Sequence, residues 1–301
     1  MPPIVQPGQV AVGIQLPVQA QSHYFVEPWE LEAGPAELAA VAVAADRAGF
    51  FYVAVCDHVA IPRSRAAGMG TIWYDPVATL SWLAAQTTHT RLLTSVYNLL
   101  YRSALVAAKS FATLDLLSAG RVIIGVGAGH LEEEFEAVGV TFAGRGSRLD
   151  AALGQLDEAL SEEWVNEVAV APRPIQRPRP PIWIGGSAPP AVRRAARLAD
   201  GWLPQGTPRE QMPALLELYR TTRGDRSGDI GAITEWLYVG TPTWDVDRGC
   251  TSGSADRIAA ALRRWTELGV NHLQVRFPSR SAEELCAQVS EFGRDVLPLL
   301  S

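Results

Sequence analysis

The chain has 301 residues, of which 48% are hydrophobic and 19% are charged, and its net charge is −6. This balance excludes a disordered chain, and because Lys and Arg are scattered without a basic stripe, nucleic acid is not expected as a partner. The apolar runs are short and interrupted by Gly, Pro or charge, and the first ten residues lack a basic region followed by an apolar stretch, so neither a membrane span nor a secretory signal is expected.

The first half of the chain alternates short β-like runs with amphipathic helical stretches. Gly49 is a typical stop for a helix over residues 35–48, and Asp75 followed by Pro76 is a typical helix start. Residues 121–126 form the most strand-like run, and after Arg121 they are continuously apolar, as buried parallel strands are. The expected elements in this half are strand 10–15, helix 35–48, strand 51–55, helix 75–87, strand 92–96, helix 104–117, strand 121–126 and the helical pieces 132–138 and 147–160.

The second half continues the alternation after a proline-rich connector at residues 172–181. Eight strand–helix units predict a single-domain (β/α)₈ TIM barrel over residues 1–301, whereas a doubly wound open sheet normally has fewer strands. In such a barrel the chemistry lies on the loops that follow the strands. The remaining expected elements are strand 181–184, helix 189–198, strand 200–203, helix 208–223, strand 233–240, loop 241–253, helix 254–268, strand 271–277 and helix 282–297.

Asp57 and His58 directly follow the second expected strand. An acid beside a histidine at a strand end suits proton transfer or binding of a cofactor edge, because histidine titrates near neutral pH. The alternative is that Asp57 caps a turn and His58 is a satisfied polar residue. Ser95 and Val96 end the third expected strand and by themselves indicate only an ordinary strand end.

Glycines at positions 125, 127 and 129 follow the fourth strand and let the backbone approach a ligand closely. Their spacing does not fit G-x-G-x-x-G, so we do not expect a Rossmann site. His130 and Glu134 are four residues apart and share one face of a short helix. A polar cluster at the helix N-terminus, where the dipole favours acids, is expected here in preference to a metal pair.

Gly185, Gly186 and Ser187 follow the fifth strand and open a helix, with Arg193 and Arg194 in its next turns. Glycines, a hydroxyl and exposed amides at a helix N-terminus form an anion site, and the alternative is a plain turn with Ser187 as its N-cap. Aromatic residues near the strand-end loops suit the wall of a pocket for a planar ligand, whereas two other tryptophans are expected in the core. The first group is Trp29, Trp73, Tyr74, Trp202, Trp236 and Trp244, and the second is Trp183 and Trp265.

Four segments make the sequence resemble the bacterial luciferase-like superfamily and, within it, the oxidoreductases that depend on coenzyme F420, a deazaflavin. They are Cys56-Asp57-His58, residues 94–96, the run LDLLSAGRVIIGVGAG at 114–129, and residues 180–204, which begin PPIWIGGSAPP. The resemblance covers residues 12–298. It implies a (β/α)₈ barrel, usually a homodimer, that holds a flavin-like cofactor at the C-terminal mouth of the barrel.

The resemblance also implies roles for individual residues. Asp57 and His58 would lie beside the redox ring, the bond between Ser95 and Val96 would be a cis peptide behind the ring, and the turn at Ser187 would receive the cofactor phosphate. The residues that it places at the cofactor are Asp57, Ser95, Val96, Ala128, Gly129, Gly185, Gly186 and Ser187.

The expected reaction is hydride transfer between F420 and a small organic substrate, for which the barrel supplies binding and orientation. His58 would transfer the accompanying proton, His130 is a second candidate for it, and Asp57 would bond the ring edge or orient His58. The alternatives are an FMN-dependent monooxygenase with a reductase partner and a non-catalytic flavin-binding relative. F420-dependent sugar-phosphate dehydrogenases carry an acid where this chain has His130 and a Trp shortly after the Asp-His pair, so we do not expect their activity here.

The three cysteines, Cys56, Cys250 and Cys286, show no C-x-x-C spacing. An odd number of dispersed cysteines indicates reduced thiols in a cytoplasm and argues against a zinc site or a disulfide framework. The cysteines therefore indicate a cytoplasmic protein without a metal site, and the resemblance implies a homodimer that binds a small-molecule substrate.

Overall fold

Eight parallel strands close into a barrel in the computed structural model, which describes residues 1–246 and 249–300. Consecutive strands pair with each other, and the last strand pairs with both the first and the one before it, which closes the ring. The predicted TIM barrel is therefore confirmed. Its strands are β1 (Ala11–Gln15), β2 (Tyr52–Val55), β3 (Arg91–Thr94), β5 (Val122–Gly127), β6 (Ile182–Gly185), β7 (Gly201–Leu203), β8 (Asp229–Val239) and β10 (His272–Arg276).

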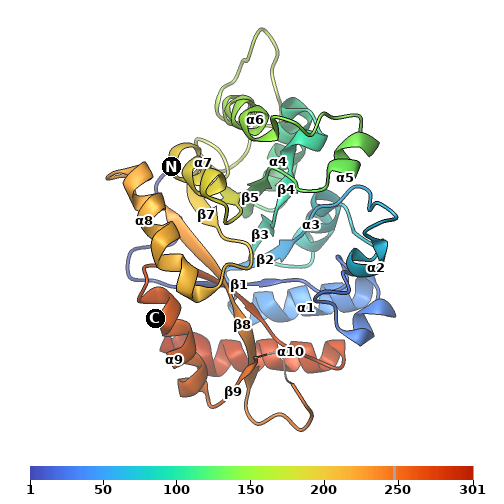
Figure 1. The fold of residues 1–301 in the computed structure, drawn as a ribbon, viewed down its shortest axis with the longest axis vertical. Coiled ribbons are helices and arrows are strands. Elements are labelled where there is room, and N and C mark those ends of the chain that lie inside the picture. The colour runs from blue at the N-terminus through green and yellow to red at the C-terminus, as the bar shows by residue number, and fades with distance from the viewer. Residues whose placement is uncertain (247–248, 301) are drawn as a thin grey trace.

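Helices surround the strands in chain order (Figure 1). Their ends follow the predicted signals: the Asp75 carboxylate accepts the Ala78 N–H at 2.9 Å, and Gly49 has a φ of 82° just beyond the first long helix. No helix in the described part of the chain is long and apolar enough to cross a membrane. The helices are α1 (Pro35–Arg47), α2 (Ala66–Met69), α3 (Pro76–Ala84), α4 (Ala104–Leu117), α5 (Glu132–Ala137), α6 (Arg145–Ser161), α7 (Pro189–Leu198), α8 (Met212–Arg223), α9 (Ala255–Thr266) and α10 (Ala282–Glu291).

The barrel interior is filled by aromatic rings at the amino ends of the strands. The Trp183 and His272 rings stack with centroids 4.1 Å apart, and the Tyr52 ring meets both edge-on. Side chains alternate between the two faces of a strand, so Gln274 and Arg276 share the inward face of β10 with His272. The inward face of β10 therefore carries polar groups toward the mouth of the barrel.

Strand β8 begins at Asp229, four residues before the predicted start at 233. The expectation was wrong because Gly231 resembles a strand breaker in the sequence. In the fold, a Cβ at Gly231 would lie 2.0 Å from the His272 ring, so glycine makes room for the buried imidazole. The strand continues to Val239 and pairs with β9 (Thr251–Gly253), which lies in the predicted loop 241–253; residues 247–248 of that loop lie outside the described residues.

Two further segments differ from their predictions. The predicted closing helix 282–297 ends as α10 at Glu291 and continues as a π turn over Phe292–Val296 and a 3₁₀ turn over Leu297–Leu299. The short strand β4 (Tyr97–Asn98) follows β3 and pairs with Val126 and Gly127 of β5. The extra pairing carries the chain from the end of β3 along the rim of the barrel.

Candidate functional site

A cavity of about 680 Å³ lies at the carboxyl ends of the barrel strands. Its volume falls within the range of about 300–1,000 Å³ that is typical of small-molecule sites. The loops after β2, β3, β5 and β6 all contribute, so every site residue expected from the sequence lines this one cavity. These residues are Asp57, His58, Ser95, Val96, Ala128, Gly129, His130, Gly185, Gly186 and Ser187.

The peptide bond between Ser95 and Val96 is cis, as the resemblance predicted. The Val96 side chain fills the space left by two glycines, because a Cβ at Gly127 or at Gly185 would lie 2.5 Å from a Val96 methyl group. The Ser95 Oγ is buried and has no hydrogen-bond partner among the described residues. This stretch therefore gives the cavity an apolar wall with one available hydroxyl.

Glu134 holds the His58 ring in place. His58 Nδ1 lies 2.8 Å from Glu134 Oε2, and the same oxygen accepts the Tyr101 hydroxyl at 2.9 Å. The other carboxylate oxygen accepts the N–H groups of Val59 at 2.6 Å and Ala60 at 3.2 Å. Burial raises the pKa of Glu134, but the hydrogen bond from His58 and the other donors outweigh burial and hold its pKa below the ordinary value.

Asp57 is engaged by a different partner. The Arg102 guanidinium donates hydrogen bonds to both carboxylate oxygens of Asp57, at 2.6 and 3.0 Å, and the Asn98 N–H donates to one of them at 2.8 Å. Burial raises the pKa of Asp57 above its ordinary value, and the Arg102 guanidinium opposes that rise. The expectation that Asp57 orients His58 is corrected, because the carboxylate that contacts the His58 ring is Glu134 and Asp57 fixes the strand ends through Arg102 and Asn98.

His130 and Trp73 complete the wall around His58. The Trp73 ring meets the His58 ring edge-on at 4.4 Å, and the His130 ring does so at 5.6 Å. Burial lowers the pKa of His130, as does the nearby His58. His130 precedes α5, whose N-cap is Leu131, so it does not share a helical face with Glu134 as expected. Within the described part of the chain, no group of three or more His, Cys, Asp or Glu side chains is suited to a metal ion.

The part of the cavity lined by α6 and α7 is cationic, but its amides differ from those expected. Helix α7 begins with Pro189 and Pro190, which carry no N–H, and its N-cap is Ala188, so the helix offers fewer amides than predicted. The Ser187 Oγ contacts the Thr207 hydroxyl and accepts the Gln205 N–H at 3.1 Å. Its hydroxyl therefore ties the turn after β6 to the loop after β7.

Helix α6 packs against α7, the helix that follows the turn after β6. Arg145 and Gly146, in its first turn, line the cavity together with Arg194 of α7. A Cβ at Gly146 would lie 2.9 Å from Arg194 Nη2, so glycine lets this guanidinium approach the start of α6. Arg194 also pairs with Asp150, which fixes its position. Two guanidinium groups and the positive end of a 17-residue helix thus meet at one end of the cavity.

The aromatic residues near the loops divide into groups. Trp73 lines the cavity, as expected, and Trp183 and Trp265 are buried, also as expected. Trp202 does not wall the cavity: it is fully buried, stacks on Tyr219 at 5.7 Å and donates from Nε1 to the Gly186 carbonyl at 2.8 Å.

The other aromatic residues lie outside the main cavity. Tyr74 lies in a groove beside α3, and Trp236 lines a smaller pocket. Trp29 and Trp244 donate from their indole N–H groups to Ser279 and Glu284. Of the aromatic residues expected to line the ligand pocket, only Trp73 therefore lines the main cavity.

Some lining residues could not be assigned from the sequence. Gln15, Arg145, Gly146 and Arg276 lack any motif that marks them, because only the closed ring brings β1, α6 and β10 to the same mouth. The sequence marked Glu134 only as part of a polar cluster at a helix N-terminus. Its contact with His58 spans 76 residues and has no signature in local spacing.

The sequence model of the luciferase-like monooxygenase family matches residues 11–241. The match covers most of the chain, so the chain belongs to this family. Its architecture is the barrel described above, with a cavity at the carboxyl ends of the strands. An uncharacterized protein of Mycobacterium tuberculosis is 29% identical over 286 residues, which cover 85% of this chain and 92% of the relative. An F420-dependent glucose-6-phosphate dehydrogenase of Kineococcus radiotolerans is 34% identical over 185 residues, so the match covers 56% of this chain and only 52% of that enzyme.

Solved structures share the fold. A monooxygenase from Streptomyces bottropensis superposes with a TM-score of 0.75 at 23% identity, covering 97% of this chain and all of that one (100%). An F420-dependent secondary alcohol dehydrogenase, solved with an F420–acetone adduct, also gives a TM-score of 0.75, at 16% identity, with 97% of this chain and 99% of that chain covered. At these identities the likeness shows the fold alone.

Proposed function

We propose that this chain is an F420-dependent oxidoreductase that transfers a hydride between the deazaflavin and a small organic substrate. The observation that carries the proposal is that one cavity combines an oriented histidine, an apolar wall at a cis peptide and a cationic end. The F420-dependent dehydrogenases among the relatives support the choice of cofactor.

The residues present fit such a cofactor. Val96 offers an apolar surface to a flat ring, and the unpartnered Ser95 Oγ is placed to bond a polar ring edge. Arg145 and Arg194 suit the phosphate of the tail, because guanidinium groups bind phosphate with charge-assisted hydrogen bonds. When bound, F420 would supply the carrier that accepts or donates the hydride.

The protein's own contribution is to hold and move a proton beside the substrate. Because a carboxylate only accepts hydrogen bonds, the Glu134 contact keeps the proton of His58 on Nδ1 and leaves Nε2 to exchange a proton with the substrate. Trp73 packs on the imidazole and shields it from water. His130, whose burial lowers its pKa, stays neutral at pH 7 and can bond to the substrate without competing for charge.

Binding of the two candidate cofactors tests the proposal directly. Purified protein is titrated with F420 and, separately, with FMN, in oxidised and reduced forms, while cofactor fluorescence and protein thermal stability are followed. We expect saturable binding of F420 and much weaker binding of FMN. Preferential binding of reduced FMN would instead assign the chain to the FMN-dependent monooxygenases, and failure to bind either cofactor would favour a non-catalytic relative. A screen of candidate substrates with F420, followed by the absorbance of the cofactor, then measures turnover.

A further inference from the structure

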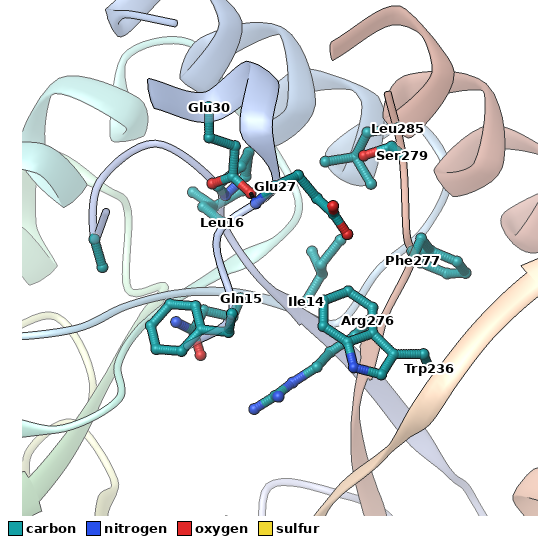
Figure 2. A pocket seen from close by; sticks show the side chains of 13 residues that line it. Ile14, Gln15, Leu16, Glu27, Glu30, Trp236, Arg276, Phe277, Ser279 and Leu285 are labelled. Atoms are coloured by element: carbon teal, nitrogen blue, oxygen red, sulfur yellow. Dashed lines mark hydrogen bonds between the residues drawn. The ribbon is translucent and has the colours of Figure 1, made fainter. Parts of the chain in front are cut away.

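Arg276 stands at the junction of several cavities. It ends β10 on the strand's inward face and lines the main cavity of about 680 Å³. It also lines a smaller pocket of about 60 Å³ beneath the 3₁₀ turn at Pro28–Leu31, and a polar pocket of about 400 Å³ beside Glu235. Figure 2 shows its guanidinium extending below Trp236 and away from the carboxylates of Glu27 and Glu30.

Its guanidinium has no carboxylate within ion-pair distance among the described residues, although it is half-buried. The guanidinium carbon of Arg276 lies over the Trp236 ring, 5.9 Å from its centroid. Other poorly exposed arginines of this chain have polar partners: Arg102 pairs with Asp57, Arg179 pairs with Asp200, and Arg223 donates to backbone carbonyls.

A desolvated cation without a counter-charge is costly, so such a group marks a place where an anion binds. Burial lowers the pKa of Arg276, yet a guanidinium stays charged at neutral pH, so the positive charge persists in the cavity wall. The Cys56 thiol nearby does not neutralise it, because burial raises the pKa of Cys56 to about 11 and the group remains a thiol.

The surroundings of Arg276 define the chemistry of the anion. The smaller pocket is lined mainly by apolar side chains, including Ile14, Phe25, Phe277 and Leu285. A single planar guanidinium matches one carboxylate through two parallel hydrogen bonds, whereas the phosphate expected at the other end of the cavity meets two arginines. The geometry therefore favours a monoanionic carboxylate on an apolar body over a phosphate ester.

We propose that Arg276 binds the carboxylate of the substrate, so that the substrates of this protein are apolar carboxylic acids. The apolar body of the acid lies against the smaller pocket, and the rest of the molecule reaches the space shared with His58. The reaction of these acids rests on the function proposed above, but their binding does not require it.

Matched acids and amides test the proposal. Cinnamate, benzoate and 2-hexenoate are each titrated against the corresponding primary amide by calorimetry, with the native protein alone and in the presence of F420. We expect at least one acid to bind about tenfold or more tightly than its amide, which is the scale of one charge-assisted hydrogen-bonded pair. Arg276→Gln should remove that preference, and Arg276→Lys should restore part of it.

The control variant is Arg280→Gln. Arg280 follows β10 closely, but its side chain is 57% exposed and paired with Glu284, so this variant should keep the preference for acids. Circular dichroism and thermal melting confirm that each variant is folded. Phenyl phosphate and inorganic phosphate are titrated in parallel, and tighter Arg276-dependent binding of either than of every carboxylate would overturn the choice of a carboxylic acid.

The proposal is overturned if no acid binds more tightly than its amide, or if the preference survives in Arg276→Gln. The two proposals fail separately. Arg276-dependent binding of acids without binding of F420 would leave this inference standing and refute the proposed function, whereas F420 binding with no preference for acids would refute the inference alone.

Discussion

His58 and Glu134 are 76 residues apart in the chain, yet the imidazole Nδ1 and the carboxylate Oε2 lie 2.8 Å apart at the mouth of the barrel. The carboxylate reaches the ring from α5, a six-residue helix that follows β5. Two N–H groups of the β2 loop and the Tyr101 hydroxyl leave Glu134 little freedom to move. The orientation of His58 is therefore set by a helix that belongs to another strand–helix unit.

Replacing Glu134 by Gln should lower turnover more than it changes the apparent affinity for substrate. The amide keeps the shape but cannot hold the His58 proton on Nδ1 as firmly, so general acid–base assistance, worth about 10²–10⁴-fold in rate, is partly lost. We expect kcat to fall at least tenfold with KM nearly unchanged. Glu133→Gln, on the same helix but exposed, is the matched control. An unchanged kcat in Glu134→Gln would show that the contact is structural only.

Replacing Gly185 by Ala should abolish cofactor binding while the barrel still folds. The new methyl group would lie 2.5 Å from Val96 and would displace the wall at the Ser95–Val96 bond. Gly154→Ala is the control, because a Cβ there has nothing within 4 Å, and in a helix interior it should stabilise the protein by up to about 1 kcal/mol. Cofactor titration and thermal melting of both variants measure the difference. Native affinity in Gly185→Ala would mean that the cofactor does not rest against Val96.

Replacing Arg194 by Gln should weaken cofactor binding. A hydrogen bond to a charged group contributes about 1.5–3 kcal/mol, so we expect the dissociation constant to rise about 10- to 100-fold. The effect should shrink at high salt, because charge interactions are screened. Arg193→Gln, at the exposed neighbouring position, should leave the dissociation constant within about twofold of native if the contribution of Arg194 is specific. Equal effects of the two variants would place the phosphate elsewhere.

Acid should destabilise the protein through His272. Burial lowers the pKa of this histidine from 6.5 to about 3, so the folded state stays unprotonated where the unfolded chain gains a proton. Stability from this residue is therefore full at neutral pH and falls as the pH drops below about 6.5, approaching about 1.4 kcal/mol per pH unit. Urea unfolding of His272→Asn should show a weaker pH dependence between about pH 6.5 and 5, where most carboxyl groups are still ionised. His89→Asn, with an exposed ring, should keep the native slope.

The strand-end positions of the site were predictable because they follow from topology. Once β2, β3, β5 and β6 are parallel neighbours, their carboxyl ends must share one rim, and His58, Val96 and Gly186 must meet there. The resemblance added the cis bond at Ser95, which no local pattern indicates.

What the sequence could not supply is the pairing of side chains across the rim. Asp57 was visible as an acid beside His58 and Glu134 as an acid near His130, but which of them faces the His58 ring depends on the path of the loop that follows β2 and on the position of Arg102. Glycine and proline positions also led to expectations that the fold corrects. Gly231 resembles a breaker until the His272 ring is seen beside it, and the amides expected at the start of α7 are fewer because Pro189 and Pro190 carry no N–H.

The indole of Trp202 joins two regions that are usually considered apart. One face of the ring packs on Tyr219 of α8 in the hydrophobic shell, while its N–H holds the carbonyl of Gly186 at the cavity. The backbone of the turn after β6 is thus anchored, through Trp202, to the outer layer of helices. Substitutions that loosen the packing of α8 should therefore change ligand affinity, although no residue of α8 lines the main cavity.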